Sequence, residues 1–510
     1  MLTTYTTTLP TTPPAYPRLA SEYYDPSKMG DPQFLKYPIL PLAQSVFGLA
    51  SPYSDHQTKQ ASRQALQDAI KEHKMAPLYA YLAHPQTGKL NASGESGSKS
   101  PTLSRANTNA SAPSPANLLR RTSSINAPSM LGVLGGNTDN SVELPWDEAK
   151  YDELKAENEK ELEAIQKEED DARENAGDVE VHNAQGKRAE YYAKIGDKDK
   201  ALDEFEKLFE KTSILGTKID IVLAILRIGL FFDDKLLVKK NIDRCQTLVE
   251  SGGDWDRRNR LKAYTGLHLL TIRSYNLAAA PLLDSLSTFT STELCPYSSL
   301  VVYATLAGAI ALPRREFKSK VVDAPEIRAV FGSASNEDRL SALGGAASAG
   351  MGADDSMETD SAPAKKDATT TPKPTVVNLT TLGTSSSTAT EEPVIDFKPL
   401  ASMVSSLYAG QYNTFFQSLA TVETDFLAQD RFLFEHKNWY VREMRLRAYQ
   451  QLLSSYRVVS LESMAKSFGV TVAWLDKDLA PFIASGRLSC SIDRVKGVIE
   501  TRREDGKGGQ

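Results

Sequence analysis

Cysteine and histidine are scarce in this chain of 510 residues. Its three cysteines, Cys245, Cys295 and Cys490, lie far apart and without a CxxC spacing, which argues against a disulfide framework or a zinc site. The six histidines form no HExxH or comparable metal-ligand pattern. Signatures of α/β-hydrolases, kinases and dinucleotide-binding enzymes are also missing from the sequence. We therefore expect a protein without catalytic residues, metal or cofactor.

Long apolar runs are missing as well. No stretch approaches the roughly 18 apolar residues that a membrane-spanning helix needs, and Met1–Ala20 lack the basic-then-apolar pattern of a secretory signal. The net charge of −6 gives the whole chain no attraction for nucleic acid or an anionic membrane. We expect no membrane partner and a location in the cytoplasm and the nucleus.

Low-complexity sequence occupies three parts of the chain. Residues 1–32 are rich in Thr, Pro and Tyr, residues 85–142 in Ser, Asn, Gly and Pro, and residues 333–395 in Ala, Gly, Ser and Thr. Such compositions bury too little apolar surface to form a core, so we expect a disordered N-terminus and two disordered insertions.

The first insertion contains a candidate regulatory site. Arg120 and Arg121 directly precede three hydroxyl side chains, an arrangement that suits a basophilic kinase. A phosphate there would add charge without disturbing a packed core. The candidate phosphorylation sites are Thr122, Ser123 and Ser124.

Helical periodicity fills the segments between these regions. Residues 33–84 predict a group of N-terminal helices. Residues 147–174 predict one long helix with thirteen acidic and five basic residues. This helix is either a solvated face with i,i+4 ion pairs or a surface that meets a basic neighbour.

Residues 143–332 predict paired helices of a tetratricopeptide-like repeat. Small and large apolar residues alternate there as they do where two helices cross closely. Turn-like positions at Asp197, Asp234 and Asn276 are about 37 to 42 residues apart, within the range of helical-repeat periods. Such units stack on one another to bury their apolar faces, which predicts a solenoid.

Residues 396–500 predict helices that lead into a winged helix, followed by a tail at 501–510. Ser460 and Thr471 are suitable N-caps of two short helices, and each helix is followed by a glycine. Two runs with strand alternation follow, at 487–492 and 495–499. This order of elements is typical of the PCI module found in scaffolding subunits. The predicted fold class is all-α: a helical-repeat solenoid followed by a PCI module with a small β-hairpin, with disordered insertions.

Two kinds of partner suit a winged helix. Nucleic acid would require basic or amide side chains on the second helix, but residues 472–485 carry Asp476, Lys477 and Asp478 among apolar residues. Phosphates would be repelled there, so we favour edge-to-edge pairing of the wing strands with a sister subunit. The candidate interface residues on these strands are Leu488, Cys490, Ile492 and Val498.

A second candidate interface lies in a charged segment around a tryptophan. Its acidic and basic side chains form either an interface patch or a charged turn that caps the next helix. The residues concerned are Asp254, Trp255, Asp256, Arg257, Arg258 and Arg260.

Several stretches resemble one family, the non-ATPase regulatory subunits numbered six (seven in budding yeast) of the 26S proteasome lid. The stretch Gly252–Lys262 is similar to a signature of that family, as are Ala189–Lys198, Arg227–Phe231, Phe415–Ala420 and Tyr440–Arg445. The resemblance implies a non-catalytic structural subunit of the 19S regulatory particle lid. Its implied partners are the other PCI subunits of the lid and the ATPase ring, in a hetero-oligomer. The alternatives are PCI subunit one of the signalosome and a winged-helix nucleic-acid-binding protein.

The sequence departs from the family pattern at three places. Both insertions are additions to the family core, and Pro481 lies inside the second helix of the winged motif, where proline removes a backbone hydrogen bond. Family members also continue into a long C-terminal helix that joins a helical bundle of the lid, whereas Arg502–Gln510 do not predict one.

Overall fold

A computed structural model describes residues 32–90, 144–175, 177–331 and 396–501. Thr122, Ser123 and Ser124 lie outside these residues, as do residues 1–31, 91–142 of the first predicted insertion, the whole second insertion and residues 502–510. The chain divides into two compact units. Of the described residues, the repeat unit contains those up to Leu312 together with Glu423–Glu443, and the C-terminal unit contains those between Pro313 and Val422 and from Met444 onward.

The repeat unit begins with a small group of helices. Leu66, Ile70 and Leu78 are buried in their common core. The hydroxyl of Tyr79 donates to the carbonyl oxygen of Pro145 at 2.6 Å and accepts from the N–H of Asp147 at 2.8 Å, so this group also fixes the start of the long acidic helix. The helices are α1 (Leu40–Ala50), α2 (His56–Glu72), α3 (Ala76–Ala83) and the acidic α5 (Glu148–Asn175).

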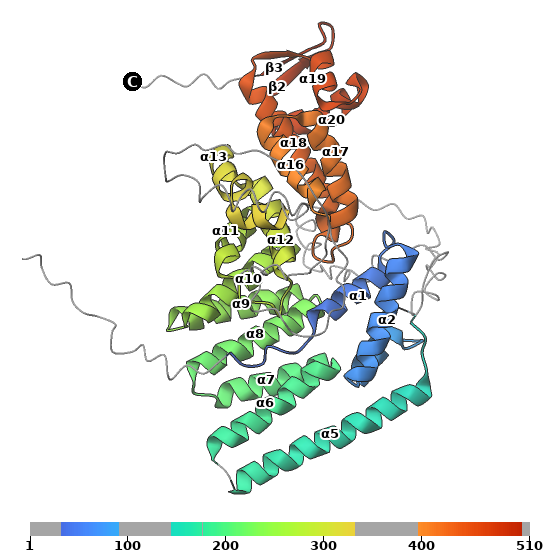
Figure 1. The fold of residues 1–510 in the computed structure, drawn as a ribbon, viewed down its shortest axis with the longest axis vertical. Coiled ribbons are helices and arrows are strands. Elements are labelled where there is room, and N and C mark those ends of the chain that lie inside the picture. Colours follow the sequence, from blue (N-terminus) through green and yellow to red (C-terminus); the bar gives the residue numbers. More distant parts are fainter. Residues whose placement is uncertain (1–31, 91–143, 176, 332–395, 502–510) are drawn as a thin grey trace, which may run out of the picture. The chain divides into compact units, whose positions relative to one another are not determined.

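Paired helices follow, and Figure 1 shows them stacked in chain order. They are α6 (Asp178–Ile195), α7 (Lys198–Lys211), α8 (Leu215–Phe231), α9 (Lys235–Glu250), α10 (Trp255–Thr271), α11 (Tyr275–Ser285), the short η5 (Leu286–Thr288) and α12 (Tyr297–Ala311). Helix α8 is buried around its whole circumference between Ile219 and Leu230, as its almost continuous apolar sequence requires. The predicted helical solenoid is confirmed.

The turns within the pairs share one backbone geometry. Gly196, Asp233 and Arg273 each adopt a left-handed conformation, with φ of 79°, 58° and 63°. In each turn the next residue donates its N–H to a carbonyl five residues back, the pattern that satisfies the last carbonyls of a helix. Asp197 and Asp234, which were predicted as turn positions, lie at these turns and cap the following helices. The prediction of a turn at Asn276 was wrong by two residues, because Ser274 precedes α11 and the buried Tyr275 is its first residue.

Residues 423–443 pack against the repeat helices although they follow them by more than a hundred positions. Their elements are η8 (Glu423–Leu427), η9 (Phe434–His436) and the first part of α18 (Lys437–Ser455). The hydroxyl of Tyr303 donates to Asp430 at 2.6 Å, and that of Tyr440 donates to the carbonyl of Leu306 at 3.2 Å. The guanidinium of Arg431 donates to the carbonyl of Leu230. These buried bonds hold the segment on the repeats.

The C-terminal unit is helical with a small sheet. Its aromatic core includes Tyr412, which stacks on Phe468 at 4.7 Å, and Tyr449, whose ring meets Phe468 at 5.0 Å. The helices are α13 (Arg314–Phe317), η6 (Lys318–Val322), α14 (Pro325–Phe331), α16 (Lys398–Ala409), α17 (Tyr412–Val422), the rest of α18, α19 (Leu461–Phe468) and α20 (Val472–Ala484). The strands are β1 (Val458–Ser460), β2 (Cys490–Asp493) and β3 (Val498–Thr501), in the antiparallel order β1-β3-β2.

The winged helix is present, but its strands differ from the prediction. Ser460 and Thr471 cap α19 and α20 as expected. The first wing strand begins at Cys490 rather than Arg487, because Arg487 and Leu488 donate their N–H groups back to α20. Strand β3 begins at Val498 rather than Val495, because residues 494–497 form the turn. Strand β1 was not predicted.

Candidate assembly surfaces

Among the described residues, no strand pairs with the outer edge of β2 in the three-stranded sheet, and we call this edge open. The N–H of Thr501 donates to the carbonyl of Arg457, so Thr501 directs its backbone groups toward β1. Ile499, two residues before Thr501 and opposite Val459, has the same direction. Backbone direction alternates along a strand, which leaves residues 498 and 500 to bond β2. Their partners in the β2 register are Asp493 and Ser491. Cys490 and Ile492 therefore point their N–H and C=O groups away from the sheet.

The predicted wing residues have different places in this arrangement. Cys490 and Ile492 lie on the open edge strand, with the Cys490 side chain buried and the Ile492 side chain partly buried. Val498 lies on the central strand, between Ser460 and Asp493. Leu488 is buried before β2 begins. The backbone of only two of the four residues can therefore meet a partner strand.

Strand β1 forms the other edge of the sheet and offers fewer backbone groups for pairing with a partner strand. The same alternation directs the backbone of Val458 outward, but after Ser460 the chain turns into α19. The signal for this strand in the sequence is the β-branched pair Val458–Val459 before an N-cap.

The second helix of the winged motif shows little basic character. Asp476 is paired with Arg494, and Asp478 is paired with Arg445 and accepts a hydrogen bond from Tyr449. Trp474 and Val472 are partly exposed at its start. Pro481 lies in the interior of this helix, as predicted from the sequence. The helix carries one lysine, the exposed Lys477, where a groove-reading helix would present several basic or amide side chains.

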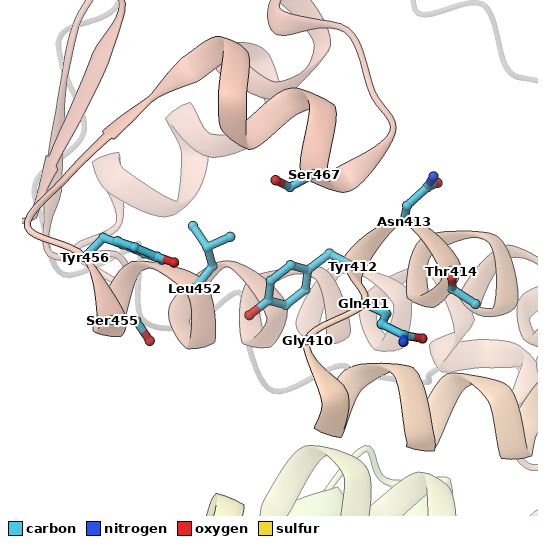
Figure 2. A pocket seen from close by; sticks show the side chains of 9 residues that line it. All are labelled: Gly410, Gln411, Tyr412, Asn413, Thr414, Leu452, Ser455, Tyr456 and Ser467. Atoms are coloured by element: carbon cyan, nitrogen blue, oxygen red, sulfur yellow. The ribbon is translucent and has the colours of Figure 1, made fainter.

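A cavity of about 520 Å³ opens beside α17 and the end of α18. Figure 2 shows Tyr412, Leu452 and Tyr456 along one side of it and Ser467 of α19 opposite. The remaining lining residues are Gly410, Gln411, Asn413, Thr414 and Ser455. No carboxylate, imidazole, thiol or amine lines this cavity, so its Ser, Thr and Tyr hydroxyls have no lining base to activate them. A second groove of about 370 Å³ lies along the β2 side, between Gln450, Leu453 and Cys490.

The charged segment around Trp255 begins helix α10 and is tied to the interior. The carboxylate of Asp254 caps the helix by accepting from the N–H of Arg257 at 3.0 Å. The guanidinium of Arg257 is buried and makes two bonds to the buried carboxylate of Asp220, at 2.8 and 2.6 Å. A third bond of 2.8 Å joins it to Asp254. These charges stabilise the join between α10 and α8.

Arg260 has an equivalent internal role. Its guanidinium bonds Asp256 at 2.6 Å and Glu293 at 2.8 Å, and the side chains of Arg260 and Glu293 are buried. Glu293 also accepts from the hydroxyl of Tyr264 at 3.1 Å. Asp220 and Glu293 were missed in the sequence because they lie 37 and 33 positions from their arginines, with no local signal. Of the six predicted residues, Trp255 and Arg258 are the exposed ones.

Groups that could carry chemistry are few in the part of the chain that the structure describes. No cluster of three or more His, Cys, Asp or Glu side chains in it could hold a metal ion. None of its helices has the length and apolar character needed to cross a membrane. Burial raises the pKa of Cys245 and of Cys295 to about 12, so both remain neutral thiols rather than nucleophiles.

Two protein-family models match the chain. The model of 26S proteasome subunit RPN7 matches residues 147–320, which include α5 and the repeat helices. The model of the PCI domain matches residues 419–503, which include the winged helix and its sheet. The two matches coincide with the helical repeats and the winged module described above.

Curated relatives match most of the chain. The 26S proteasome regulatory subunit rpn7 of Schizosaccharomyces pombe is 34% identical over 92% of this chain and 90% of its own length. The 26S proteasome regulatory subunit RPN7 of Saccharomyces cerevisiae is 37% identical over 72% of each chain. The 26S proteasome non-ATPase regulatory subunit 6 of Caenorhabditis elegans is 30% identical over 92% of this chain and 88% of its own. This chain therefore belongs to the family of 26S proteasome regulatory subunits that comprises RPN7 and non-ATPase regulatory subunit 6.

Proposed function

We propose that this chain is a non-catalytic structural subunit of the 19S regulatory particle lid of the 26S proteasome. It scaffolds the assembly that carries out ATP-dependent degradation of ubiquitinated proteins, in the cytoplasm and the nucleus. Its partners are other PCI subunits of the lid and the ATPase ring. Its family membership and the open edge of β2 carry the proposal.

The open edge suggests how a sister subunit attaches. A strand laid beside β2 would meet the N–H and C=O groups of Cys490 and Ile492, four backbone groups in all. At about 0.5–1.5 kcal/mol for each hydrogen bond, the pairing contributes about 2–6 kcal/mol. This amount fixes the register of the partner but is too small for a stable complex once the entropy of association is subtracted. We therefore expect further contact surfaces on the chain.

A non-catalytic role fits the chemistry of the described residues. The largest cavity described above is lined by neutral side chains. The side chains of α20 that carry charge are mostly paired within the chain, which disfavours the nucleic-acid alternative. The relatives carry the name of proteasome subunits, which favours the lid over the signalosome.

The experiment compares Ile492→Pro with Ile492→Ala in the tagged full-length chain. Both variants remove the isoleucine side chain, but proline also removes the outward N–H of the edge without breaking a bond to β3. Native affinity purification with mass spectrometry measures the recovery of lid and ATPase subunits. We expect the alanine variant to recover them like the wild type and the proline variant to recover less of them.

Hydrogen exchange in α19 and α20 serves as the control that the module remains folded in both variants. Equal recovery with the proline and alanine variants would refute pairing through this edge. A wild-type chain that recovers no proteasome subunit would refute the proposed function itself.

A further inference from the structure

The open edge of β2 adjoins the groove of about 370 Å³, which we call the β2 groove. Cys490 belongs to both, because it lies on the edge strand and also lines the groove. The other walls come from the end of α18, from residues 487–489 before β2 and from Thr501 of β3, all within the C-terminal unit. A strand that pairs with β2 therefore lies directly beside the β2 groove.

Alternation along the strands determines which side chain of a partner meets the β2 groove. Cys490 and Ile492 are opposite Thr501 and Ile499, so these four side chains share one face of the sheet. Ile499 is fully buried, which identifies this face as the one that packs on the interior. In an added strand of either direction, the residue opposite Cys490 projects from the same face. Because neighbouring strands are about 4.8 Å apart, the side chain of that residue lies over the β2 groove.

The floor of the β2 groove is apolar. Leu453 of α18, Leu488 and Cys490 line it, and they are 6%, 4% and 5% exposed. Leu453 and Cys490 are contributed by elements that the fold holds in place, the end of α18 and the first position of β2. An apolar side chain set on this floor would leave water without removing a polar group from it.

The polar groups of the lining offer little to a polar occupant. The amide of Gln450 and the hydroxyls of Ser454 and Thr501 each already donate to a backbone carbonyl of this chain, at 3.1, 2.9 and 2.8 Å. Arg487 and Ser489 are exposed at the rim. No carboxylate lines the groove, so a cationic side chain would be buried there without a counter-charge. The lining therefore favours an uncharged apolar occupant.

We propose that the β2 groove receives a large apolar side chain of the partner strand, at the residue opposite Cys490. This inference rests on the proposed function, because it requires the strand of a sister subunit beside β2. The unpaired backbone groups of Cys490 and Ile492 specify that the occupant is a strand, and the β2 groove specifies one of its residues. In strand addition the backbone bonds supply affinity, and pockets for alternate side chains supply specificity. A strand with a charged residue at this position would meet the same backbone groups but be rejected by the groove.

Filling the β2 groove from within this chain tests the proposal, because such a change leaves the edge of β2 intact. Ser454 is an exposed residue of α18 that lines the groove, and Ser454→Trp places an indole ring there. Ser489→Trp does the same from the segment before β2. Ser405→Trp on α16 is the matched control. Like Ser454, Ser405 is an exposed helical serine whose hydroxyl donates to the carbonyl three residues back, but it is not part of the groove.

The assay is competition between two tagged chains in the assembled complex. Wild type and a variant are co-expressed with different tags, and mass spectrometry measures their ratio in the purified regulatory particle relative to their ratio in the extract. We expect Ser454→Trp and Ser489→Trp to be at least about ten-fold under-represented, and Ser405→Trp to incorporate like wild type. Hydrogen exchange in α19 and α20 shows whether each variant keeps the module folded.

A diazirine amino acid at position 489 identifies the occupant of the β2 groove. The expected product joins this chain to one other subunit, at a peptide in which a large apolar residue occurs with strand alternation. A crosslink to residues 502–510 of the same chain, or to a peptide with a charged residue at that place, would overturn the assignment of the occupant.

The competition assay separates this inference from the proposed function. If wild type assembles and both groove variants compete equally with it, no partner side chain fills the groove, and the inference is wrong while the proposed function stands. If wild type does not assemble at all, the proposed function is wrong, and this inference falls with it.

Discussion

The buried pair of Arg257 and Asp220 gives the most quantitative prediction for the repeat unit. The two side chains are 2% and 0% exposed, and the shortest distance between them is 2.6 Å. The perturbation is Arg257→Met, which keeps most of the length and apolar volume of the side chain but removes its charge. Among the described residues, Asp220 then keeps only the backbone N–H of Gln33, at 2.9 Å, as a hydrogen-bond donor.

The expected cost follows from leaving a carboxylate buried without its cation. Breaking a buried ion pair by removing one partner costs about 3–5 kcal/mol. Asp254 also loses one bond to Arg257 but is less buried and regains water. The double variant Arg257→Met with Asp220→Leu removes both charges, so it should cost much less than the single variant.

Hydrogen exchange is the suitable assay because a chain of this size does not unfold in one step. Exchange of amides in α8 and α10 reports the local opening free energy of the helices that the pair joins. A loss of about 3–5 kcal/mol corresponds to a decrease in protection of roughly two to four orders of magnitude. The decrease should be confined to the repeat unit.

Arg258→Met is the matched control, since it removes an exposed arginine one position away, which meets only a backbone carbonyl within the described part of the chain. It should change protection by less than a factor of about three. If Arg257→Met and Arg258→Met gave the same protection in α8, the buried pair would not stabilise the join between the helices. The reasoning would also fail if the double variant were less stable than Arg257→Met.

Two further predictions concern the turns and pH. Gly196→Ala should destabilise α6 and α7 by more than the roughly 1–2 kcal/mol of left-handed backbone strain, because its Cβ would lie 2.7 Å from Leu78 Cβ. Gly486→Ala, with φ of 73° and open space around it, should show the backbone strain alone. Hydrogen exchange of the two regions compares these losses of stability. Burial lowers the pKa of His268 and of His436 below its ordinary value, so the unfolded chain binds more protons. The free energy of unfolding should therefore fall as pH decreases through about 6.5. The fall in the thermal midpoint should be smaller in the variant with both histidines changed to glutamine. An equal fall in that variant would contradict the role given to these two histidines.

The local signals in the sequence predicted helix boundaries well. Asp197, Asp234, Ser460 and Thr471 are N-caps in the structure because a cap needs only a side-chain oxygen and the N–H groups two or three residues later. The same locality explains the wrong turn at Asn276. A turn-forming residue was present, but the buried Tyr275 before it already belongs to the helix.

The small sheet was predicted less well because strand limits depend on bonds to distant residues. The N–H groups of Arg487 and Leu488 are satisfied by the carbonyl of Phe482, so these residues end a helix although their side chains alternate as in a strand. Strand β1 has only three residues and exists because β3 lies beside it. Its β-branched residues suggest a strand, but nothing local identifies a partner more than thirty positions away.

The charged segment at the start of α10 shows that a sequence can indicate a local helix cap but not which charged side chains turn into the interior. Asp254, Arg257 and Arg260 suggested either an interface or a capping turn, and the capping bond of Asp254 spans three residues. The distant partners of the two arginines are Asp220 on α8 and Glu293 in the loop before α12, so the direction of these side chains is decided by packing. Once those charges are assigned to the interior, the exposed Trp255 and Arg258 need a separate explanation. The ion pairs that keep Arg257 and Arg260 in the interior therefore leave Trp255 and Arg258 as the exposed side chains of this segment.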